Sequence, residues 1–194
     1  MTLAGDTRLI RARQCPSPNC DLRPPGCVID LLVIHSISLP PGRFGDGWID
    51  DLFLNRLDPD AHPYFRDICR LRVSSHLLIR RGGELVQYVP LDRRAWHAGV
   101  SAFRGRTACN DFSIGIELEG DDETPFTDAQ YHTLIQTIAD IRELYPTITP
   151  DRIVGHSDIA PGRKTDPGPC FDWGRIGIWR DHPASGGPDP APGR

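Results

Sequence analysis

The composition is that of a chain that folds in water. It has 194 residues, 39% of them hydrophobic and 25% charged, with a formal net charge of −4. These values are typical of one soluble globular domain and give no basic surface for nucleic acid or an anionic membrane. No apolar run approaches the ~20 residues of a membrane span, and the N-terminus lacks the apolar core of an export signal. We therefore expect a cytoplasmic protein without a nucleic-acid, membrane or obligate protein partner.

The chain divides into three segments by composition. Residues 1–27 are rich in Pro and Cys and predict a loop that wraps the domain. Residues 28–180 carry interleaved strand and helix patterns, which favour a single α/β domain. Residues 181–194 have the composition of a flexible tail, and no internal repeat is visible in the sequence.

Three segments have the pattern of β-strands. Residues 28–35 (VIDLLVIH) are almost continuously apolar, which predicts a buried central strand that ends at His35. Residues 74–90 predict a hairpin that turns at a Gly-Gly pair. Residues 111–120 (DFSIGIELEG) alternate, so that Glu117 lies on the face opposite the apolar row.

Helical signals are confined to two segments. Residues 127–146 combine a helical apolar stripe with capping-box spacing at Thr127 and Gln130, and Phe126 with Tyr131 predicts a hydrophobic staple. Residues 49–57 predict a shorter helix. By contrast, residues 155–170 hold six Gly and Pro residues, so neither a helix nor a central strand is expected there.

Two of the seven histidines share a context that points to a metal. His35 and His156 each follow a short apolar run and precede an irregular loop, and Asp166 lies ten positions after His156. Two imidazoles and one carboxylate with an open fourth position are the ligand set of a catalytic zinc, which lowers the pKa of water to about 7. The other interpretation of residues 155–170 is an ordinary solvated loop.

The remaining parts of such a site have candidates as well. Glu117 is a candidate general base, although an ordinary strand carboxylate facing solvent has the same pattern. Lys164 is a candidate donor to an oxyanion, although most lysines are surface residues. His62, His132 and His182 are expected to be ordinary polar residues.

The six cysteines are expected to be reduced thiols, because no export signal precedes them. Two minor alternatives involve them. One is a structural zinc site at Cys15, Cys20 and Cys27, which lack a CxxC pair. The other is a thiol nucleophile formed by Cys109 and His97, which nothing in the sequence places together.

Longer motifs make a family resemblance visible. Together they span about residues 14–176 in one order, and the chain closely resembles the AmpD family of cytoplasmic N-acetylmuramoyl-L-alanine amidases specific for 1,6-anhydro-muropeptides. The matching motifs are PSPNCDLRP, VIHSISLPPGRFG, DPDAHPYF, RLRVSSHLLIRRGGELVQYVP, RRAWHAGVS, CNDFSIGIELEG, TDAQY and GHSDIAPGRKTDPGPCFDW.

The resemblance implies a fold and a reaction. The fold is a central mixed β-sheet flanked by helices, as in phage amidases and peptidoglycan-recognition proteins. One Zn²⁺ would be held by His35, His156 and Asp166, with Glu117 as general base and Lys164 as oxyanion donor. The reaction is hydrolysis of the amide between 1,6-anhydro-N-acetylmuramic acid and L-alanine in a small soluble muropeptide, a step of peptidoglycan recycling.

The resemblance also implies a recognition cleft, in which five residues are candidates for substrate binding. Arg72 suits a peptide carboxylate, Trp96 and His97 line the sugar side, and His76 lies in the pocket near the metal. Ser36 stands where the family commonly has Asn. Another departure is Ala108, where the family commonly has Arg, and both positions predict weaker contacts because a donor is lost.

Two other functions of the same fold remain as alternatives. A module that binds wall fragments without cutting them typically lacks a zinc ligand. An autolysin acting on the intact wall needs export. In addition, the Pro and Gly residues around 36–48 suggest a mobile lid over the site.

Overall fold

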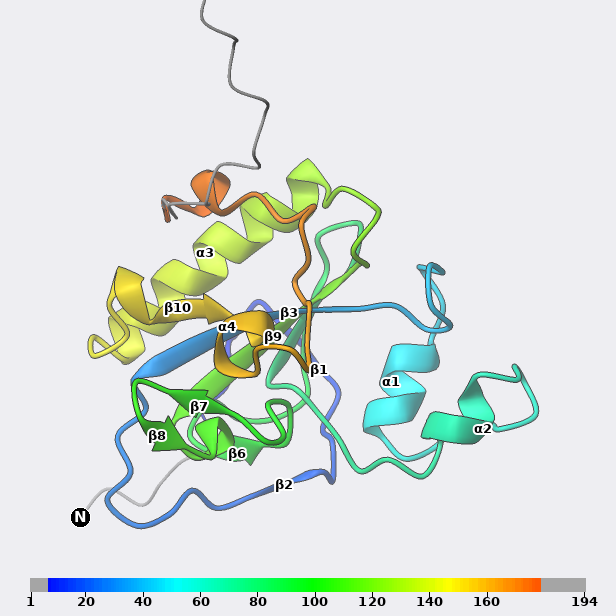
Figure 1. The fold of residues 1–194 in the computed structure, drawn as a ribbon, viewed down its shortest axis with the longest axis horizontal. Coiled ribbons are helices and arrows are strands. Elements are labelled where there is room, and N and C mark those ends of the chain that lie inside the picture. Colours follow the sequence, from blue (N-terminus) through cyan, green and yellow to red (C-terminus); the bar gives the residue numbers. More distant parts are fainter. Residues whose placement is uncertain (1–6, 179–194) are drawn as a thin grey trace, which may run out of the picture.

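A mixed β-sheet with helices on both faces forms the centre of the computed structural model, which describes residues 7–178 (Figure 1). Neighbouring strands are parallel, except that β4 and β5 form an antiparallel hairpin. Within residues 7–178 the sheet has six strands, in the spatial order β1 (Arg13–Gln14), β5 (Leu85–Gln87), β4 (Leu77–Ile79), β9 (Ser113–Glu119), β3 (Leu31–Ile37) and β10 (Ile153–Gly155). The α/β class and the mixed sheet predicted from the sequence are confirmed.

Smaller elements surround this sheet. Two pairs of short strands lie outside it, β2 (Cys20–Asp21) with β6 (Arg94–Ala95) and β7 (Ala102–Phe103) with β8 (Arg106–Thr107). The helices are α1 (Trp48–Phe53), α2 (Phe65–Ile68), α3 (Asp128–Leu144) and α4 (His156–Ile159), with 3₁₀ turns η1 (Cys109–Asp111), η2 (Pro150–Arg152) and η3 (Trp173–Ile176). Across residues 7–178, no helix combines the length and the apolar character that crossing a membrane requires.

The predicted long helix and hairpin are present. Thr127 caps α3, its side chain accepting from the Gln130 amide while the Gln130 side chain accepts from the Thr127 amide. The rings of Phe126 and Tyr131 contact each other edge to face, as a hydrophobic staple requires. The hairpin turns at Gly83, whose φ of 86° is in the region that favours glycine.

The first core strand is shifted relative to its prediction. β3 begins at Leu31 and continues to Ile37, so His35 lies within the strand and not at its end. The reason is the partner strand: pairing with β9 continues through His35 opposite Glu117 to Ile37 opposite Glu119. Inter-strand hydrogen bonds therefore extend the strand past the apolar run.

Three other segments have a structure that differs from the one predicted from their sequence. The N-terminal segment is not only a loop, because it supplies β2 and the edge strand β1. The helix expected over 49–57 ends at Phe53, before Asn55 takes a φ of 60°. The Gly/Pro-rich segment starts with α4, since its first Pro is Pro161 and the preceding HSDI stretch is free of both residues. The predicted tail, 181–194, lies outside the described residues.

Alternation along the strands sorts side chains between two faces. Leu32 and Ile34 of β3 pack with α3 in one core cluster. Leu31 and Val33 pack on the opposite face in another. His35 shares that second face by alternation, on the side of the sheet away from α3.

Candidate active site

Three adjacent parallel strands bring the candidate residues together at the edge where those strands end. His35 on β3 lies directly opposite Glu117 on β9. On the other side of β3, Gly155 of β10 pairs with Ile34, so His156 follows at the level of His35. The carboxyl ends of parallel strands are the usual place for ligand sites in such sheets.

Asp166 reaches this edge because its loop folds back on α4. The Ser157 amide donates to the Asp166 carbonyl at 3.0 Å. Pro167 packs on Gly155 so closely that a Cβ added there would lie 2.8 Å from Cδ of the proline. Glycine at position 155 therefore allows the loop to approach.

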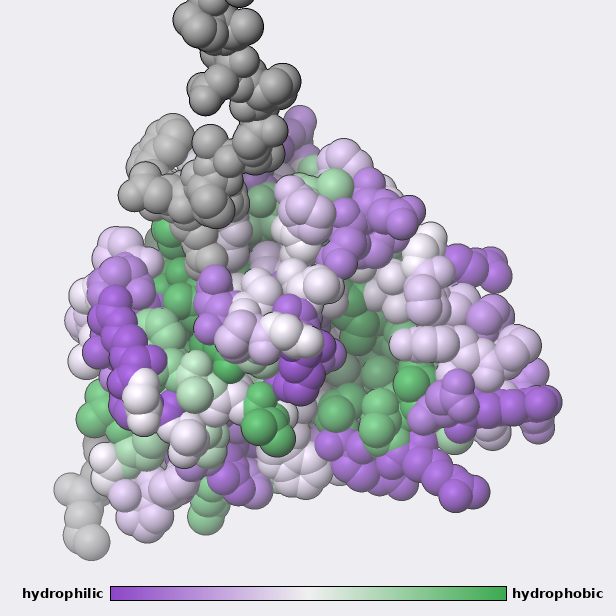
Figure 2. All heavy atoms as spheres, viewed as in Figure 1, coloured by the Kyte–Doolittle hydropathy of each residue, from purple (hydrophilic) through white to green (hydrophobic). Residues whose placement is uncertain are grey.

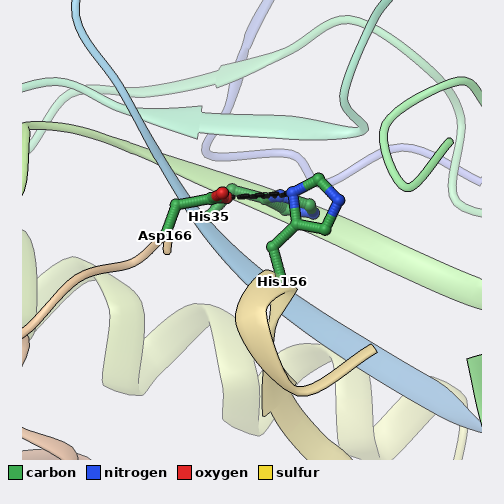
Figure 3. A group of neighbouring side chains, drawn as sticks. All are labelled: His35, His156 and Asp166. Carbon is green, nitrogen blue, oxygen red and sulfur yellow. Dashed lines mark hydrogen bonds and ion pairs between the residues drawn. The ribbon is translucent and has the colours of Figure 1, made fainter. Parts of the chain in front are cut away.

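The side chains of His35, His156 and Asp166 converge on one point (Figure 3). The His35 Nδ1 atom lies 3.0 Å from both His156 Nδ1 and Asp166 Oδ2. The His156 Nδ1 atom lies 3.1 Å from the same carboxylate oxygen. This is the one group of ligating side chains of this kind within residues 7–178.

The hydrogen-bonding capacity of these atoms fits a cation among them. An imidazole nitrogen offers one hydrogen or one lone pair, and a carboxylate oxygen only accepts. Three mutual contacts of about 3 Å therefore cannot all be satisfied by the two Nδ1 atoms and the carboxylate alone. A cation accepts a lone pair from all three, and two nitrogens with one oxygen are donors that suit Zn²⁺.

Burial and the neighbouring side chains together set the charges in the cluster. His35 is 1% exposed, and burial lowers its pKa to about 4, although Asp166 acts in the opposite direction. The imidazole is therefore neutral near pH 7. Burial alone would raise the pKa of Asp166, but its hydrogen bonds to His156 and His35 lower it well below the usual range.

Glu117 is buried beside this cluster and does not face solvent, so the solvent-facing alternative is wrong. Its exposed fraction is 8%, and within residues 7–178 its Oε2 atom has no hydrogen-bond partner. Burial raises its pKa well above the usual value, the Asp166 charge adds to this, and the Lys164 charge opposes it. A raised pKa makes the carboxylate a stronger base.

A cavity of about 760 Å³ opens above these residues. Ser36, Trp96, His97 and the exposed Lys164 line it together with Glu117. One arm of the cavity is apolar, and Figure 2 shows hydrophobic side chains in a hollow beside α1. The apolar residues of this arm are Leu52, Phe53, Tyr64, Ile68, Leu71 and Val73.

The segment suggested as a lid forms one wall of the cavity, from Ser36 to Gly42. Its far end is tied to the sheet. The Gly45 amide donates to Glu119 Oε1 at 2.7 Å, and Arg80 Nη1 donates to the Asp46 carbonyl at 2.8 Å. These bonds anchor residues 45–46 beside the strand that carries Glu117.

Two predicted substrate residues are not brought to the cavity, and Ala108 does not line it either. The Arg72 side chain is exposed, and its guanidinium donates to the carbonyls of Arg70 and Leu71. His76 is fully buried behind His97, with the two ring centroids 5.6 Å apart, and its Nδ1 accepts from the Gly115 amide.

The structure adds cavity residues that the sequence analysis did not single out. The acidic run from Asp121 to Glu123 lines one side, as does Thr165. The acidic run follows directly after the strand of Glu117, and that position is the signal by which it could have been found. The apolar arm has no comparable signal, since its members are spread over two separate segments, residues 52–53 and 64–73.

Both cysteine alternatives are wrong. Cys109 is fully buried, and burial raises the pKa of its thiol, so it is a poor nucleophile. Cys15, Cys20 and Cys27 do not belong to the metal-binding cluster found in residues 7–178. All six cysteines lie in that range, and none forms a disulfide.

Comparison with known proteins finds relatives that match most of this chain. Residues 25–169 match the family described as N-acetylmuramoyl-L-alanine amidase. The 1,6-anhydro-N-acetylmuramyl-L-alanine amidase AmpD of Enterobacter cloacae is 61% identical over 168 residues, which are 87% of this chain and 89% of that protein. AmpD of Escherichia coli K12 is 58% identical over 170 residues, which are 88% and 92% of the two chains.

Solved structures give the same result. A crystal structure of a selenomethionine AmpD derivative has a TM-score of 0.86 and 57% identity, covering 90% of this chain and 97% of its own. The complex of E. coli AmiD with the substrate anhydro-N-acetylmuramic acid-L-Ala-D-gamma-Glu-L-Lys has a TM-score of 0.58 and 35% identity, covering 80% of this chain and 59% of its own. The chain therefore belongs to the N-acetylmuramoyl-L-alanine amidase family, in its AmpD group.

Proposed function

We propose that this protein hydrolyses the amide bond between 1,6-anhydro-N-acetylmuramic acid and the L-alanine of a stem peptide. Its substrate would be a small soluble muropeptide in the cytoplasm, and the reaction would serve peptidoglycan recycling. The observation that carries the proposal is the convergence of His35, His156 and Asp166 beside the buried Glu117, at the floor of a cavity. The AmpD relatives and the ligand of the AmiD complex support the substrate class.

Zinc is the ion that we propose for the three ligands, because the donor set is two imidazole nitrogens and one carboxylate oxygen. When bound, it would polarise the scissile carbonyl and make water acidic enough to lose a proton near neutral pH. In the metal-free protein burial keeps the His35 imidazole neutral, and the neighbouring His156 and His35 rings hold the pKa of the Asp166 carboxyl well below its usual range. Both groups are therefore in the protonation states that ligation needs.

Glu117 would move the proton. Its buried Oε2 lacks a partner in residues 7–178, so it is available to accept a proton from the attacking water. The oxygen of that water forms a bond to the lactyl carbonyl carbon, and the C–N bond then breaks. Glu117 returns the proton to the leaving nitrogen, which leaves a lactyl carboxylic acid and a free stem peptide with an amino terminus.

Lys164 would stabilise the negative oxygen that develops on the carbonyl. It lines the cavity, and its charge acts on both Glu117 and His35. Removal of one good donor of this kind typically costs about 3–4 kcal/mol of transition-state stabilisation. Ser36 and Trp96 line the same cavity and would contact the substrate around the scissile bond.

The test is mass spectrometry of the purified protein with an anhydro-muropeptide. We expect release of free stem peptide, loss of that release after chelation, and recovery when zinc is added back. Binding of the muropeptide without release in the zinc-loaded protein would instead establish a binding module. Release that survives complete metal removal would reject the metal mechanism.

A further inference from the structure

Each of the two candidate metal-binding histidines has a hydrogen-bond partner on the ring nitrogen that faces away from the cluster. His35 Nε2 lies 2.9 Å from His97 Nδ1. His156 Nε2 lies 3.1 Å from the carbonyl oxygen of Ala98. The two partners therefore belong to consecutive residues of the chain.

The directions of these bonds follow from the ligand atoms. A neutral imidazole has one N–H, and a carbonyl only accepts, so His156 carries its hydrogen on Nε2 and keeps a lone pair on Nδ1. For His35 Nδ1 to be a ligand as well, its Nε2–H must donate to His97 Nδ1. His97 then carries its hydrogen on Nε2, which lies 3.2 Å from Ser113 Oγ, an atom able to accept it.

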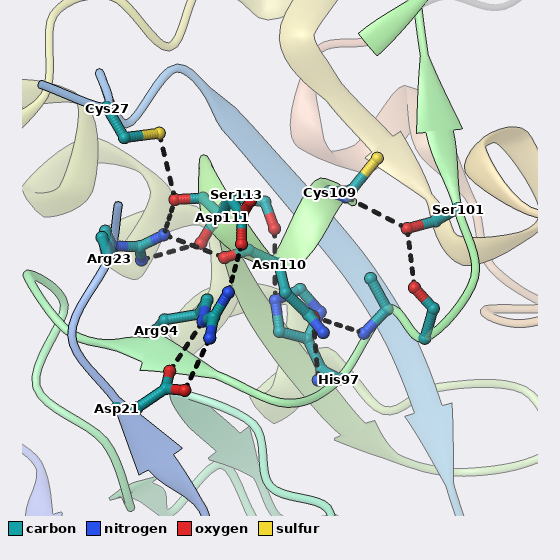
Figure 4. Close-up of polar contacts among 12 residues, drawn as sticks. Asp21, Arg23, Cys27, Arg94, His97, Ser101, Cys109, Asn110, Asp111 and Ser113 are labelled. Carbon is teal, nitrogen blue, oxygen red and sulfur yellow. Dashed lines mark hydrogen bonds and ion pairs between the residues drawn. The ribbon is translucent and has the colours of Figure 1, made fainter. Parts of the chain in front are cut away.

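One side chain holds both partners in place. The Asn110 Oδ1 atom accepts from the backbone amide of His97 at 3.1 Å and from that of Ala98 at 2.8 Å (Figure 4). Asn110 lies on the 3₁₀ turn η1, directly before β9. A single carboxamide oxygen thus binds both amides of the dipeptide that faces the two histidines, while Arg163 Nη2 donates to the Ala98 carbonyl at 2.8 Å.

Close packing holds the His97 ring as well. A Cβ added to Gly115 would lie 2.6 Å from His97 Nδ1, a distance at which the ring would have to move. Only glycine at this position of β9 leaves space for the ring next to His35. The ring therefore has little freedom to turn away from its partner.

We propose that Asn110 and the dipeptide His97–Ala98 form an outer bracket that orients both metal-binding imidazoles, with His97 and Asn110 as positioning residues. The inference rests on the metal site of the proposed function. Outer partners that orient ligating histidines typically contribute about 10- to 100-fold in metal affinity. Here one asparagine would act on two ligands at once.

The experiment compares Asn110→Ala with Asn110→Asp in the full-length protein. Zinc affinity is measured by competition with a chromophoric chelator, and the absorption spectrum of the Co²⁺-substituted protein reports ligand geometry. We expect Asn110→Ala to bind zinc about 10- to 100-fold more weakly and to alter the Co²⁺ spectrum. Asn110→Asp retains an accepting oxygen, so the zinc affinity of this variant should fall by less than about 10-fold.

A second pair acts on the ring itself and keeps the test decisive if Asn110→Ala does not fold. His97→Gln can still accept from His35 and donate to Ser113, whereas His97→Phe fills similar space without either function. We expect the glutamine variant to bind zinc more tightly than the phenylalanine variant. Equal affinities within this pair, or an unchanged affinity in folded Asn110→Ala, would overturn the proposal.

Thr127→Ala is the matched control, because loss of this helix cap destabilises the fold without touching the site. It should leave zinc affinity unchanged. If the native protein itself binds no zinc, the proposed function fails. If the native protein binds zinc and the bracket variants bind it equally well, only the inference about the bracket fails.

Discussion

Glu117 and Glu119 occupy the same face of β9, two residues apart, and both are buried. Glu119 is fully satisfied, because it accepts from the Gly45 and Arg81 amides and pairs with Arg80. Glu117 has one oxygen without a partner in the described chain. Buried polar groups are nearly always hydrogen-bonded, so an unpaired carboxylate beside a cavity indicates a chemical role over a structural one.

Replacement of this carboxylate by its neutral isostere separates catalysis from folding. We expect Glu117→Gln to lower kcat by about 10²- to 10⁴-fold, because proton transfer is lost, while zinc affinity is retained. The free energy of unfolding should be unchanged or higher, since a buried charge without a partner is removed. Single-turnover kinetics and urea unfolding of the same preparation measure both effects.

Glu119→Gln is the control on the same strand. It breaks a satisfied network and should therefore reduce stability, with a smaller effect on the chemical step. The assignment of Glu117 as proton acceptor would be refuted if the two variants lost kcat equally at full zinc occupancy.

Buried neutral histidines give a second prediction, for the metal-free protein. Burial lowers the pKa of His35 to about 4, and burial, with added positive charge nearby, lowers the pKa values of His76 and His97 well below 6.5. Between these values and 6.5 the unfolded chain binds more protons than the folded protein. The free energy of unfolding should therefore fall as the pH falls from about 7 to about 5, by up to ~1.4 kcal/mol per unit for each group.

Glu117 has the opposite effect on the free energy of unfolding over part of this range. Its pKa is raised in the folded state, so as the pH falls the folded protein takes up this proton before the unfolded chain does. Urea unfolding with a chelator should therefore show a steeper dependence on pH in Glu117→Gln than in the native protein. A flat profile between pH 7 and 5 in that variant would contradict buried neutral histidines.

At the scale of elements, the turn from β10 into α4 depends on a glycine. Gly155 precedes α4, contacts Pro167 and donates its amide to Asp158. Its φ of −85° is available to any residue, so its requirement for glycine is purely steric. The loop that carries Asp166 is therefore positioned by contact with the end of a strand.

Gly155→Ala should displace that loop through the clash with Pro167. We expect weaker zinc binding and a kcat reduced by about 10²-fold, the cost of a misplacement on the order of 1 Å. Gly47→Ala is a matched control, since Gly47 also precedes a helix with a negative φ and has no atom within 4 Å of an added Cβ. Equal behaviour of the two variants in a zinc competition assay would count against the steric argument.

At the scale of the molecule, a metal would join segments that are distant in the chain. His35 lies 121 residues from His156 and 131 from Asp166, and the three come from β3, α4 and the following loop. A ligand that binds only the folded state stabilises it by mass action, by ~2.7 kcal/mol at 100 times its Kd. Metal binding at this cluster would therefore be coupled to the stability of the fold.

Zinc should raise the unfolding temperature of the native protein in a concentration-dependent way, and chelation should reverse this. Asp166→Asn should lose most of the shift, because the variant no longer supplies a charged ligand. Differential scanning calorimetry at several zinc concentrations provides the measurement. The same shift in Asp166→Asn as in the native protein would show that zinc acts at another place.

Much of the fold was predictable because it depends on near neighbours in the chain. The α3 helix follows from a helical stripe and a capping box, and the hairpin follows from two apolar runs around a Gly-Gly pair. The candidate ligands His35, His156 and Asp166 were recognisable because their motifs are local. Side-chain periodicity and turn chemistry act over only a few residues, so one sequence suffices to infer them.

The surroundings of the ligands were decided by tertiary structure alone. Sheet register places Glu117 opposite His35 and buries it, and the fold places His76 behind His97 and keeps Arg72 away from the cavity. The contact of Asn110 with residues 97–98 likewise joins a 3₁₀ turn to a loop. The sequence by itself determined which residues can bind a metal, whereas the pairing of distant strands determined what surrounds them, because side-chain contacts across a sheet depend on register and not on local pattern.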